Sequence, residues 1–458
     1  MITDEDIDQI GARPLTTGDW FKVVGIMAIY RELKGTIPMP GQKAQKRFLL
    51  LTLYADANVG DFILAIIFLY QLAKFFLPSH PQHDFHWRQK AILAAIRTSN
   101  VFQSQKRIVY AGGHTKTSSE RMRGYAAKRE GIKHREVSVP INAAVTAANP
   151  ATGRATSSPT LHFFSGPWPA GEPSNDDDKD GHGRGDGPII VYAHGGGYVE
   201  PIAPSAHVAL ARSMAKACGA RQVIFVVYAL CPEAQYPSQL VQIVESLRYL
   251  LEQENISPGD LVLAGDSAGA HMMASLLAHI AAPAPYVPPL RPSGQFLAVV
   301  LLSPWFTWTD AASLGASACD FLEGPHTANL VRVLRPRVED VWCEIVAAPN
   351  AHEVWACVFG VEGSGEKPLV KRLLVTASDS EIMHRDARVF AVEYAGATSV
   401  SVGAGDSETQ FARVRSETRV FAVGRRETHA QPALDEAVRY YGGGAWRALQ
   451  AFMSSLRD

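Results

Sequence analysis

The segment Leu261-Val-Leu-Ala-Gly-Asp-Ser-Ala-Gly-Ala-His271 is the most informative stretch of the chain. Its first four residues are apolar and predict a short buried strand, and the run from Ala270 to Ile280 predicts a helix that ends before Pro283. Between them lies Gly265-Asp-Ser-Ala-Gly269, a G-x-S-x-G pattern on a tight strand-to-helix turn. Such a turn exposes the hydroxyl of Ser267 and points the free N–H groups of the helix at it. A chance match is the alternative, and the flanking strand and helix weigh against it.

The composition excludes several classes of protein. The chain has 458 residues, of which 47% are hydrophobic and 19% charged. Its net charge of −1 shows no excess of basic residues of the kind that nucleic-acid-binding proteins carry. Its five cysteines are scattered, odd in number and lack the spacing of a zinc site or a disulfide framework. The N-terminus is acidic, without the basic start of a secretory signal. We therefore expect an intracellular, cytoplasmic protein, with association with an internal membrane as the alternative.

Residues 1–120 are predicted to form an N-terminal helical cap or membrane-proximal segment, ahead of a catalytic domain at 121–458. The longest apolar run, Phe62–Leu77, has 16 residues interrupted by Gln71 and Lys74. A membrane-spanning helix needs about 20 apolar residues, so this run is too short. A buried or cap helix is the first expectation, and peripheral contact with a membrane surface is the alternative.

From Pro188 onward, predicted strands and helices alternate, which favours a mostly parallel sheet with helices on both faces. Residues 306–367 lack clear strands and are predicted to be a cap insertion. The expected strands are 135–140, 161–164, 189–192, 222–228, 261–264, 296–302, 372–376 and 419–423, with helices at 206–218 and 240–254.

Two segments have a superficial likeness to metal sites. The stretch 171–187 carries three aspartates at alternate positions, but a glycine stands where a calcium loop needs its glutamate, so a flexible surface insertion is expected. Three histidines lie in 79–86, but Pro81 breaks any helix that would align them. No metal and no cofactor are expected.

A serine nucleophile needs a base, an acid that orients the base, and donors for the oxyanion. The glycine-rich loop His194-Gly-Gly-Gly197 follows a predicted strand, and its N–H groups at Gly196 and Gly197, with that of Ala268, are the expected oxyanion donors. His194 itself is expected to brace this loop. His429, on the loop after the last predicted strand, is the candidate base because it completes the order Ser, acid, His.

The acid is expected in the loop after the strand at 372–376. Asp379, Glu381 and Asp386 all lie there, and position alone does not choose among them. Asp386 stands where the next helix is predicted to begin, which is also compatible with a helix N-cap.

Six motifs together resemble the hormone-sensitive lipase branch of the α/β-hydrolases. They are HGGGY at 194–198, YALCPEAQYP at 228–237, GDSAGAH at 265–271, SPW at 303–305, an acid loop, and THA at 428–430. The resemblance covers 188–435, and more loosely 120–187. It is strongest to fungal-type esterases and deacetylases, including steryl acetyl hydrolases and hydrolases of secondary-metabolite pathways.

The resemblance implies an α/β-hydrolase fold with an eight-stranded core, a cap partly from the N-terminus, and metal-free hydrolysis of a carboxylic ester. It assigns the nucleophile to Ser267 and the base to His429. It places the acid at Glu381, two residues before an apolar Met383 and five before Asp386. The chain departs from the pattern at the 171–187 insertion, at the polar stretch 403–417, and at Ser378, where a glycine is usual.

The predicted function is therefore that of a serine esterase or deacetylase acting on an apolar small-molecule ester. Acyl transfer, lactonisation or elimination at the same site, in a biosynthetic pathway, remains an alternative. A non-hydrolytic receptor on the same fold is a second alternative, which the presence of His429 opposes. The sequence leaves the oligomeric state and the identity of the acyl and alcohol groups open.

Overall fold

The structure is a computed structural model that describes residues 67–103, 116–141, 156–166, 168, 187–306, 308, 314, 316–360 and 367–457. The chain consists of two compact units, Met1–Val109 and Tyr110–Asp458. The predicted insertion at 171–187 lies, apart from Gly187, outside the described residues, as does the first part of the apolar run Phe62–Leu77.

The described part of the first unit contains a helical segment at 67–74, a series of turns, and helix α5 (Trp87–Gln103). Phe75 and Leu93 are fully buried in it, and the polar Gln71 that interrupts the apolar run is buried too. Among the residues that the structure describes, no helix has both the length and the apolar character to cross a membrane.

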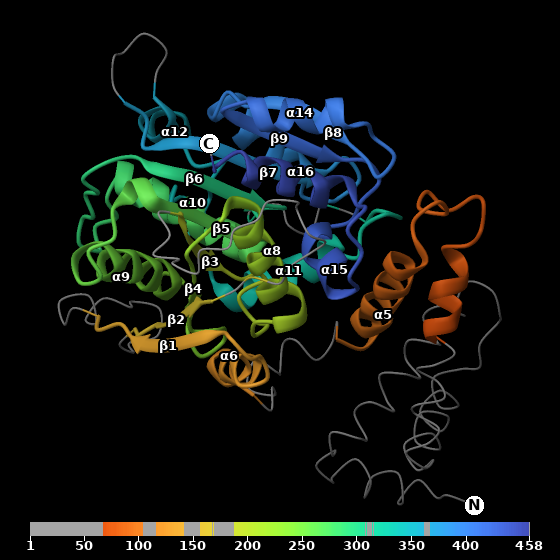
Figure 1. Cartoon of the computed structure of the whole chain (residues 1–458), viewed down its shortest axis with the longest axis horizontal. Helices are drawn as coiled ribbons and strands as arrows, with labels where there is room; N and C mark the ends of the chain where they lie inside the picture. Colours follow the sequence, from red (N-terminus) through yellow and green to blue (C-terminus); the bar gives the residue numbers. More distant parts are fainter. Residues whose placement is uncertain are drawn as a thin grey trace, which may run out of the picture. The chain divides into compact units, whose positions relative to one another are not determined.

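The second unit is built on one sheet with the strand order β1-β2-β4-β3-β5-β6-β7-β9-β8. Figure 1 shows these strands from β1, in orange, near the bottom to β8, in blue, at the top. β2 is antiparallel to both β1 and β4, and all the other neighbours are parallel. The strands are β1 Lys133–Ser138, β2 Thr160–Ser165, β3 Ile189–Ala193, β4 Gln222–Val227, β5 Leu261–Asp266, β6 Phe296–Leu302, β7 Val370–Ser378, β8 Thr398–Val402 and β9 Arg419–Gly424.

The predicted mostly parallel sheet is thus confirmed, but it has nine strands in the described residues instead of eight. The strand missed from the sequence is β8, Thr-Ser-Val-Ser-Val, which forms the sheet edge beside β9. Only Val400 and Val402 of this strand are buried, and its other three residues are partly or fully exposed. An edge strand with one polar face carries too few apolar residues to stand out in the sequence.

Helices cover both faces of the sheet. One buried cluster joins the sheet to α9, α10 and α12, and the other joins it to α6, α8, α14 and α16. The helices of the second unit are α6 Ser118–Ala126, α8 Ala209–Cys218, α9 Ser238–Glu252, α10 Ala268–Ala281, α11 Gly324–Leu334, α12 Ala351–Phe359, α13 His384–Arg388, α14 Glu408–Ser416, α15 Gln431–Ala437 and α16 Gly444–Ser454. Pro204–Val208, just before α8, and Val389–Tyr394, just after α13, are π-helical turns, and Pro258–Asp260 is a 3₁₀ turn.

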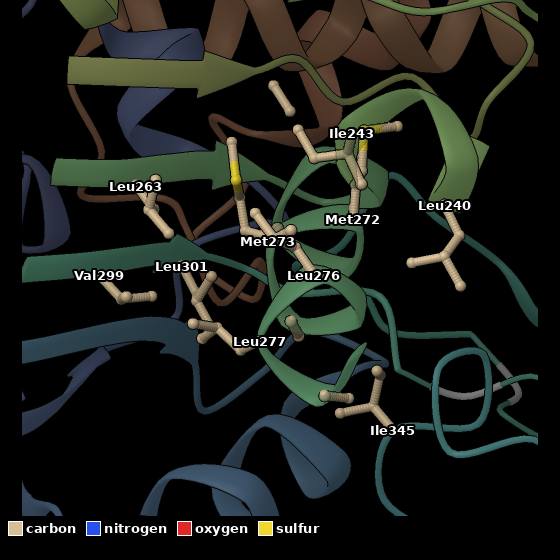
Figure 2. Packing of buried hydrophobic residues seen from close by; sticks show 14 of the residues in the cluster. Leu240, Ile243, Leu263, Met272, Met273, Leu276, Leu277, Val299, Leu301 and Ile345 are labelled. Atoms are coloured by element: carbon tan, nitrogen blue, oxygen red, sulfur yellow. The ribbon is translucent and has the colours of Figure 1, made fainter. Parts of the chain in front are cut away.

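Helix α10 is the central helix of its face, and nearly all of its residues are buried. Figure 2 shows Met273 and Leu277 beside the strand residues Leu263 and Leu301, while Ile243 of α9 lies by Met272. A helix that is apolar all round belongs in a core, and here that core fixes the helix directly behind Ser267.

The region 306–367 contains α11, α12 and a single isolated bridge between Ala316 and Glu323 among its described residues. No longer strand occurs in this described part, as the sequence predicted.

Candidate active site

Ser267 follows directly after β5 and has φ 51° and ψ −118°, a conformation that only a tightly constrained residue adopts. The constraint comes from the two glycines of the motif. A Cβ on Gly265 would lie 2.5 Å from the backbone of Gly269, and a Cβ on Gly269 would lie 2.0 Å from the carbonyl oxygen of Ala193. The strand, the helix and the end of β3 therefore approach so closely that only glycine fits at both positions.

The glycine-rich loop after β3 has the geometry of an anion-binding turn. Gly196 and Gly197 have φ 105° and 59°, and the Gly196 carbonyl accepts the N–H groups of Val199 and Glu200. Among the hydrogen bonds of the described residues, none uses the N–H of Gly196 or Gly197 as donor. The N–H of Ala268, the first residue of α10, has no partner within its helix either. The three predicted donors are therefore available to an oxyanion.

Asp266, beside the serine, ties this loop to β5. Its carboxylate accepts the Gly195 N–H at 3.0 Å and the Tyr192 hydroxyl at 2.6 Å, and His207 Nε2 lies 3.5 Å away. Burial alone would raise the pKa of Asp266, but these partners outweigh it and lower the pKa to about 2. The side chain is thus a carboxylate that holds the loop, and its low pKa makes it a weak base.

His194 and His271 are both buried near this loop, and both have structural partners. The His194 ring stacks on Tyr228 at 4.6 Å, and burial lowers its pKa to about 3. His271 Nδ1 accepts the Tyr198 hydroxyl at 2.7 Å, and its Nε2–H donates to the Cys343 carbonyl at 2.7 Å. His271 therefore links the glycine-rich loop, helix α10 and the cap segment.

Glu381 and His429 form a buried pair. Glu381 follows β7, His429 follows β9, and His429 Nδ1 lies 3.7 Å from Glu381 Oε2. This distance is that of an ion pair and exceeds a hydrogen bond. The carboxyl ends of the parallel strands β5, β6, β7 and β9 lie along one edge of the sheet, which brings this pair to the same edge as Ser267.

The two groups shift each other's protonation. Burial raises the pKa of Glu381, although His429 and the Ser303 hydroxyl oppose the shift. Burial alone would lower the pKa of His429, but the Glu381 carboxylate, with Asp320 and Asp266 farther off, outweighs it and raises the pKa above the ordinary value. The Glu381 carboxylate therefore favours the protonated form of the imidazole.

Two residues outside the predicted triad hold the acid and base loops together. Ser303, with φ 45° at the end of β6, donates its hydroxyl to Glu381 Oε2 at 2.9 Å and accepts the Ala430 N–H at 2.9 Å. Buried Asp320 accepts the Ile382 N–H at 2.9 Å, the Thr428 hydroxyl at 3.0 Å and the His429 N–H at 3.3 Å. One carboxylate from the region between β6 and β7 thus fastens both loops.

The other two acid candidates point to different roles. Asp379 is exposed, and its Oδ1 accepts the Arg426 N–H at 2.8 Å, so it braces the loop after β9 from outside. Asp386 is the third residue of α13, whose N-cap is Met383. The N-cap role suggested for Asp386 is therefore wrong, because α13 begins at His384, two residues before Asp386.

Sequence reasoning missed Ser303 and Asp320 as parts of the site. Ser303 had a usable signal, since it belongs to the SPW motif and directly follows a predicted strand. Asp320 had none, because it lies in a region without periodicity and reaches residues 62 to 109 positions away.

Comparison with known families agrees with this geometry. Residues 190–408 match the model of a family with the alpha/beta hydrolase fold. The α/β-hydrolase fold predicted from the sequence is thereby confirmed, and the matched segment contains Ser267, Glu381 and the glycine-rich loop, while His429 lies beyond it.

Three similar proteins place the α/β-hydrolase segment among known sequences and structures. An acetyl-hydrolase of Streptomyces hygroscopicus is 31% identical over 210 residues, 45% of this chain and 61% of that protein. An esterase of Gibberella moniliformis is 38% identical over 93 residues, 20% of this chain and 29% of that protein. A solved esterase of the bacterial hormone-sensitive lipase family has 18% identity and a TM-score of 0.46, over 81% of this chain and 98% of that one. The chain thus spans less than two thirds of the length of both sequence relatives.

Proposed function

We propose that the chain is a serine carboxylic-ester hydrolase. The observation that carries the proposal is the strained serine at φ 51°, placed at the same sheet edge as a buried carboxylate–imidazole pair. A strained residue and a buried pair with shifted pKa values are both typical of catalytic sites. The sequence relatives support the reaction class, since they are an acetyl-hydrolase and an esterase.

In the proposed mechanism, His429 removes the proton from the Ser267 hydroxyl as its oxygen attacks the ester carbonyl. The tetrahedral oxyanion accepts the N–H groups of Gly196, Gly197 and Ala268. His429 then protonates the leaving alcohol, and water attacks the acyl-enzyme by the reverse sequence. Glu381 orients the imidazole throughout and stabilises its positive charge.

An apolar substrate fits the side chains beside the base. The Phe321 ring meets the imidazole of His429 edge to face at 5.9 Å. A Cβ on Gly197 would meet Leu330 of α11 at 2.6 Å, so this helix borders the oxyanion loop. The acetyl-hydrolase relative supports a short acyl group as the first one to test.

Labelling with a fluorophosphonate tests the proposal, followed by a panel of esters from acetyl to decanoyl. We expect one phosphonate per chain, on Ser267, and turnover of at least one ester. A stoichiometric adduct on another residue would contradict the assignment. Product analysis with and without an acceptor alcohol separates hydrolysis from acyl transfer, because a transferase forms a new ester at the expense of free acid.

We further propose that the first unit contacts a membrane surface. The described residues contain seven exposed large apolar side chains. Five of them lie in the described part of the first unit, residues 67–103, namely Leu69, Tyr70, Phe76, Leu77 and Trp87. Residues 67–103 carry four basic side chains against one acidic side chain, which suits an anionic lipid surface.

Flotation with phosphatidylcholine vesicles, with and without phosphatidylserine, tests this second proposal. We expect binding that requires the anionic lipid and falls in the double variant Phe76→Ser, Trp87→Ser. The matched control is Tyr441→Ser, which removes an exposed aromatic ring of the second unit. Equal flotation of all three proteins would contradict the proposal.

A further inference from the structure

Three metal-ligating side chains meet on the β1–β2 hairpin. Glu136 stands directly opposite His162 in the antiparallel register, and His134 lies two residues before Glu136 on the same face of β1. His134 Nε2 is 2.9 Å from His162 Nδ1, and His162 Nδ1 is 3.8 Å from Glu136 Oε2. The three ligand atoms lie within 4.8 Å of one another.

We propose that His134, Glu136 and His162 bind a divalent transition-metal ion, with zinc the best match to two imidazoles and one carboxylate. Zinc takes such ligands at about 2.0–2.2 Å in a tetrahedron, which sets neighbouring ligand atoms about 3.3 Å apart. The observed separations between ligand atoms lie on both sides of this value. Side-chain rotations that move these atoms by well under 2 Å would therefore bring them to the spacing that zinc requires. Glu136 is exposed, and the fourth position is therefore open to solvent.

The surroundings of His162 support this role. Its Nε2 lies 2.9 Å from the hydroxyl of Ser119 on α6, which orients the ring so that Nδ1 points at His134 and Glu136. Metal-bound histidines usually have a partner of this kind on their second nitrogen. The His134 ring is held in turn by stacking on His162 at 5.2 Å and by contact with Phe164 at 4.9 Å.

Burial opposes the protonation of both histidines. Burial, and to a smaller extent the neighbouring His134 and Arg123, lower the pKa of His162 to about 4, although Glu136 opposes the shift. Burial also lowers the pKa of His134, with Glu136 again acting in the opposite direction and Arg123 in the same one.

One group competes with the metal. Arg123 of α6 donates to both carboxylate oxygens of Glu136, at 3.0 and 3.1 Å. Both side chains of this ion pair are well exposed, and exposed pairs are weak. The arginine can move aside, or keep one oxygen while the metal takes the other.

The site would clamp the edge of the sheet, and it is independent of ester hydrolysis. β1 is the edge strand, and β2, β4 and β3 separate it from β5, which carries the proposed nucleophile. A bound ion would join β1 to β2 by ligand bonds in addition to their backbone ladder. Metal occupancy should therefore change stability and leave ester turnover alone.

Equilibrium dialysis of the untagged, chelator-treated full chain against zinc, followed by metal analysis, tests the proposal. We expect about one zinc per chain, and a rise in Tm on the order of 3 °C at saturating zinc. His134→Gln and Glu136→Gln should each weaken binding by about tenfold or more. Arg123→Gln should tighten it, because the competitor for Glu136 is gone.

His352→Gln is the matched control, since His352 is an exposed histidine beside Glu353 without a second imidazole. It should bind zinc like the parent chain. If the parent chain bound no more zinc than His134→Gln, or if His352→Gln lost as much affinity, the site would be refuted. Ester turnover, measured in parallel with and without zinc, should stay the same in all of these proteins that carry the proposed triad intact.

Discussion

The loops after β3 and β5 and the loops after β7 and β9 face the same edge of the sheet, but they are held by different means. On the first side, backbone packing fixes the geometry: Gly265 and Gly269 allow approaches that no side chain would tolerate. On the second side, side-chain hydrogen bonds from Ser303 and Asp320 fix the acid and the base. The nucleophile is thus placed by local sequence, and its partners are placed by residues far away in the chain.

This difference predicts two kinds of failure. A substitution in the loops after β3 and β5 should lower the stability of the fold, because the backbone itself must move. A change in the side held by hydrogen bonds should leave a folded protein with a misplaced base. Changes to the reacting groups themselves should affect catalysis more than either.

The largest expected effect is that of Ser267→Ala. Removing the nucleophile should lower kcat by on the order of a millionfold while the fold survives, because alanine keeps the packing of the elbow. Single-turnover and steady-state rates on the best ester, with circular dichroism as the folding control, measure it. Activity that survives in this variant would remove Ser267 from the mechanism.

Next in size is Glu381→Gln, which should lower kcat about ten-thousandfold with KM nearly unchanged, because the imidazole loses the charge that orients and stabilises it. Asp379→Asn is the matched control in the same loop. Asp379 braces the Arg426 N–H from an exposed position, so its change should affect Tm more than kcat. The reverse pattern would make Asp379 the acid.

Gly269→Ala tests the side held by backbone packing. Its methyl group would meet the Ala193 carbonyl oxygen at 2.0 Å, which costs about 1–3 kcal/mol of stability or more. Urea unfolding should show a lower midpoint, and the remaining folded protein should be impaired as well. Gly294→Ala is the control, since a Cβ there meets nothing within 4 Å. Equal stability of the two variants would argue against the packing account.

Asp320→Asn tests the side held by hydrogen bonds and should have the smallest effect, a loss of about 10- to 100-fold in kcat/KM. The telling readout is the pH profile. His429 must be neutral to act as base, so activity falls as the pH drops through its raised pKa. Removing the charge of Asp320 destabilises the imidazolium, lowers that pKa and moves the acid limb to lower pH. If the acid limb of the pH profile did not move in this variant, Asp320 would have only a structural role.

The same contrast explains what the sequence could reveal. The serine elbow and the glycine-rich loop were predictable, because glycine at fixed spacings reports a backbone constraint within a few residues. Glu381 was preferred over Asp379 through a resemblance, and because Asp379 lies nearer the strand end with a shorter side chain. The buried position of Glu381 and the exposure of Asp379 depend on the fold. Asp320 could not be predicted, because its partners lie 62 to 109 positions away in the chain. Strand β8 escaped because an edge strand needs only two buried valines.

The hydrogen bonds of His271 have a consequence for changes of specificity. The Tyr198 hydroxyl and the Cys343 carbonyl are bound to the two nitrogens of one ring, so the turn that carries the proposed oxyanion donors shares an anchor with the proposed cap. Replacing the 306–360 region to admit a different substrate would remove one end of that anchor. A transplanted cap that lacks a carbonyl at this point would alter the rate on every ester alike, and new selectivity would come with a uniform loss of turnover.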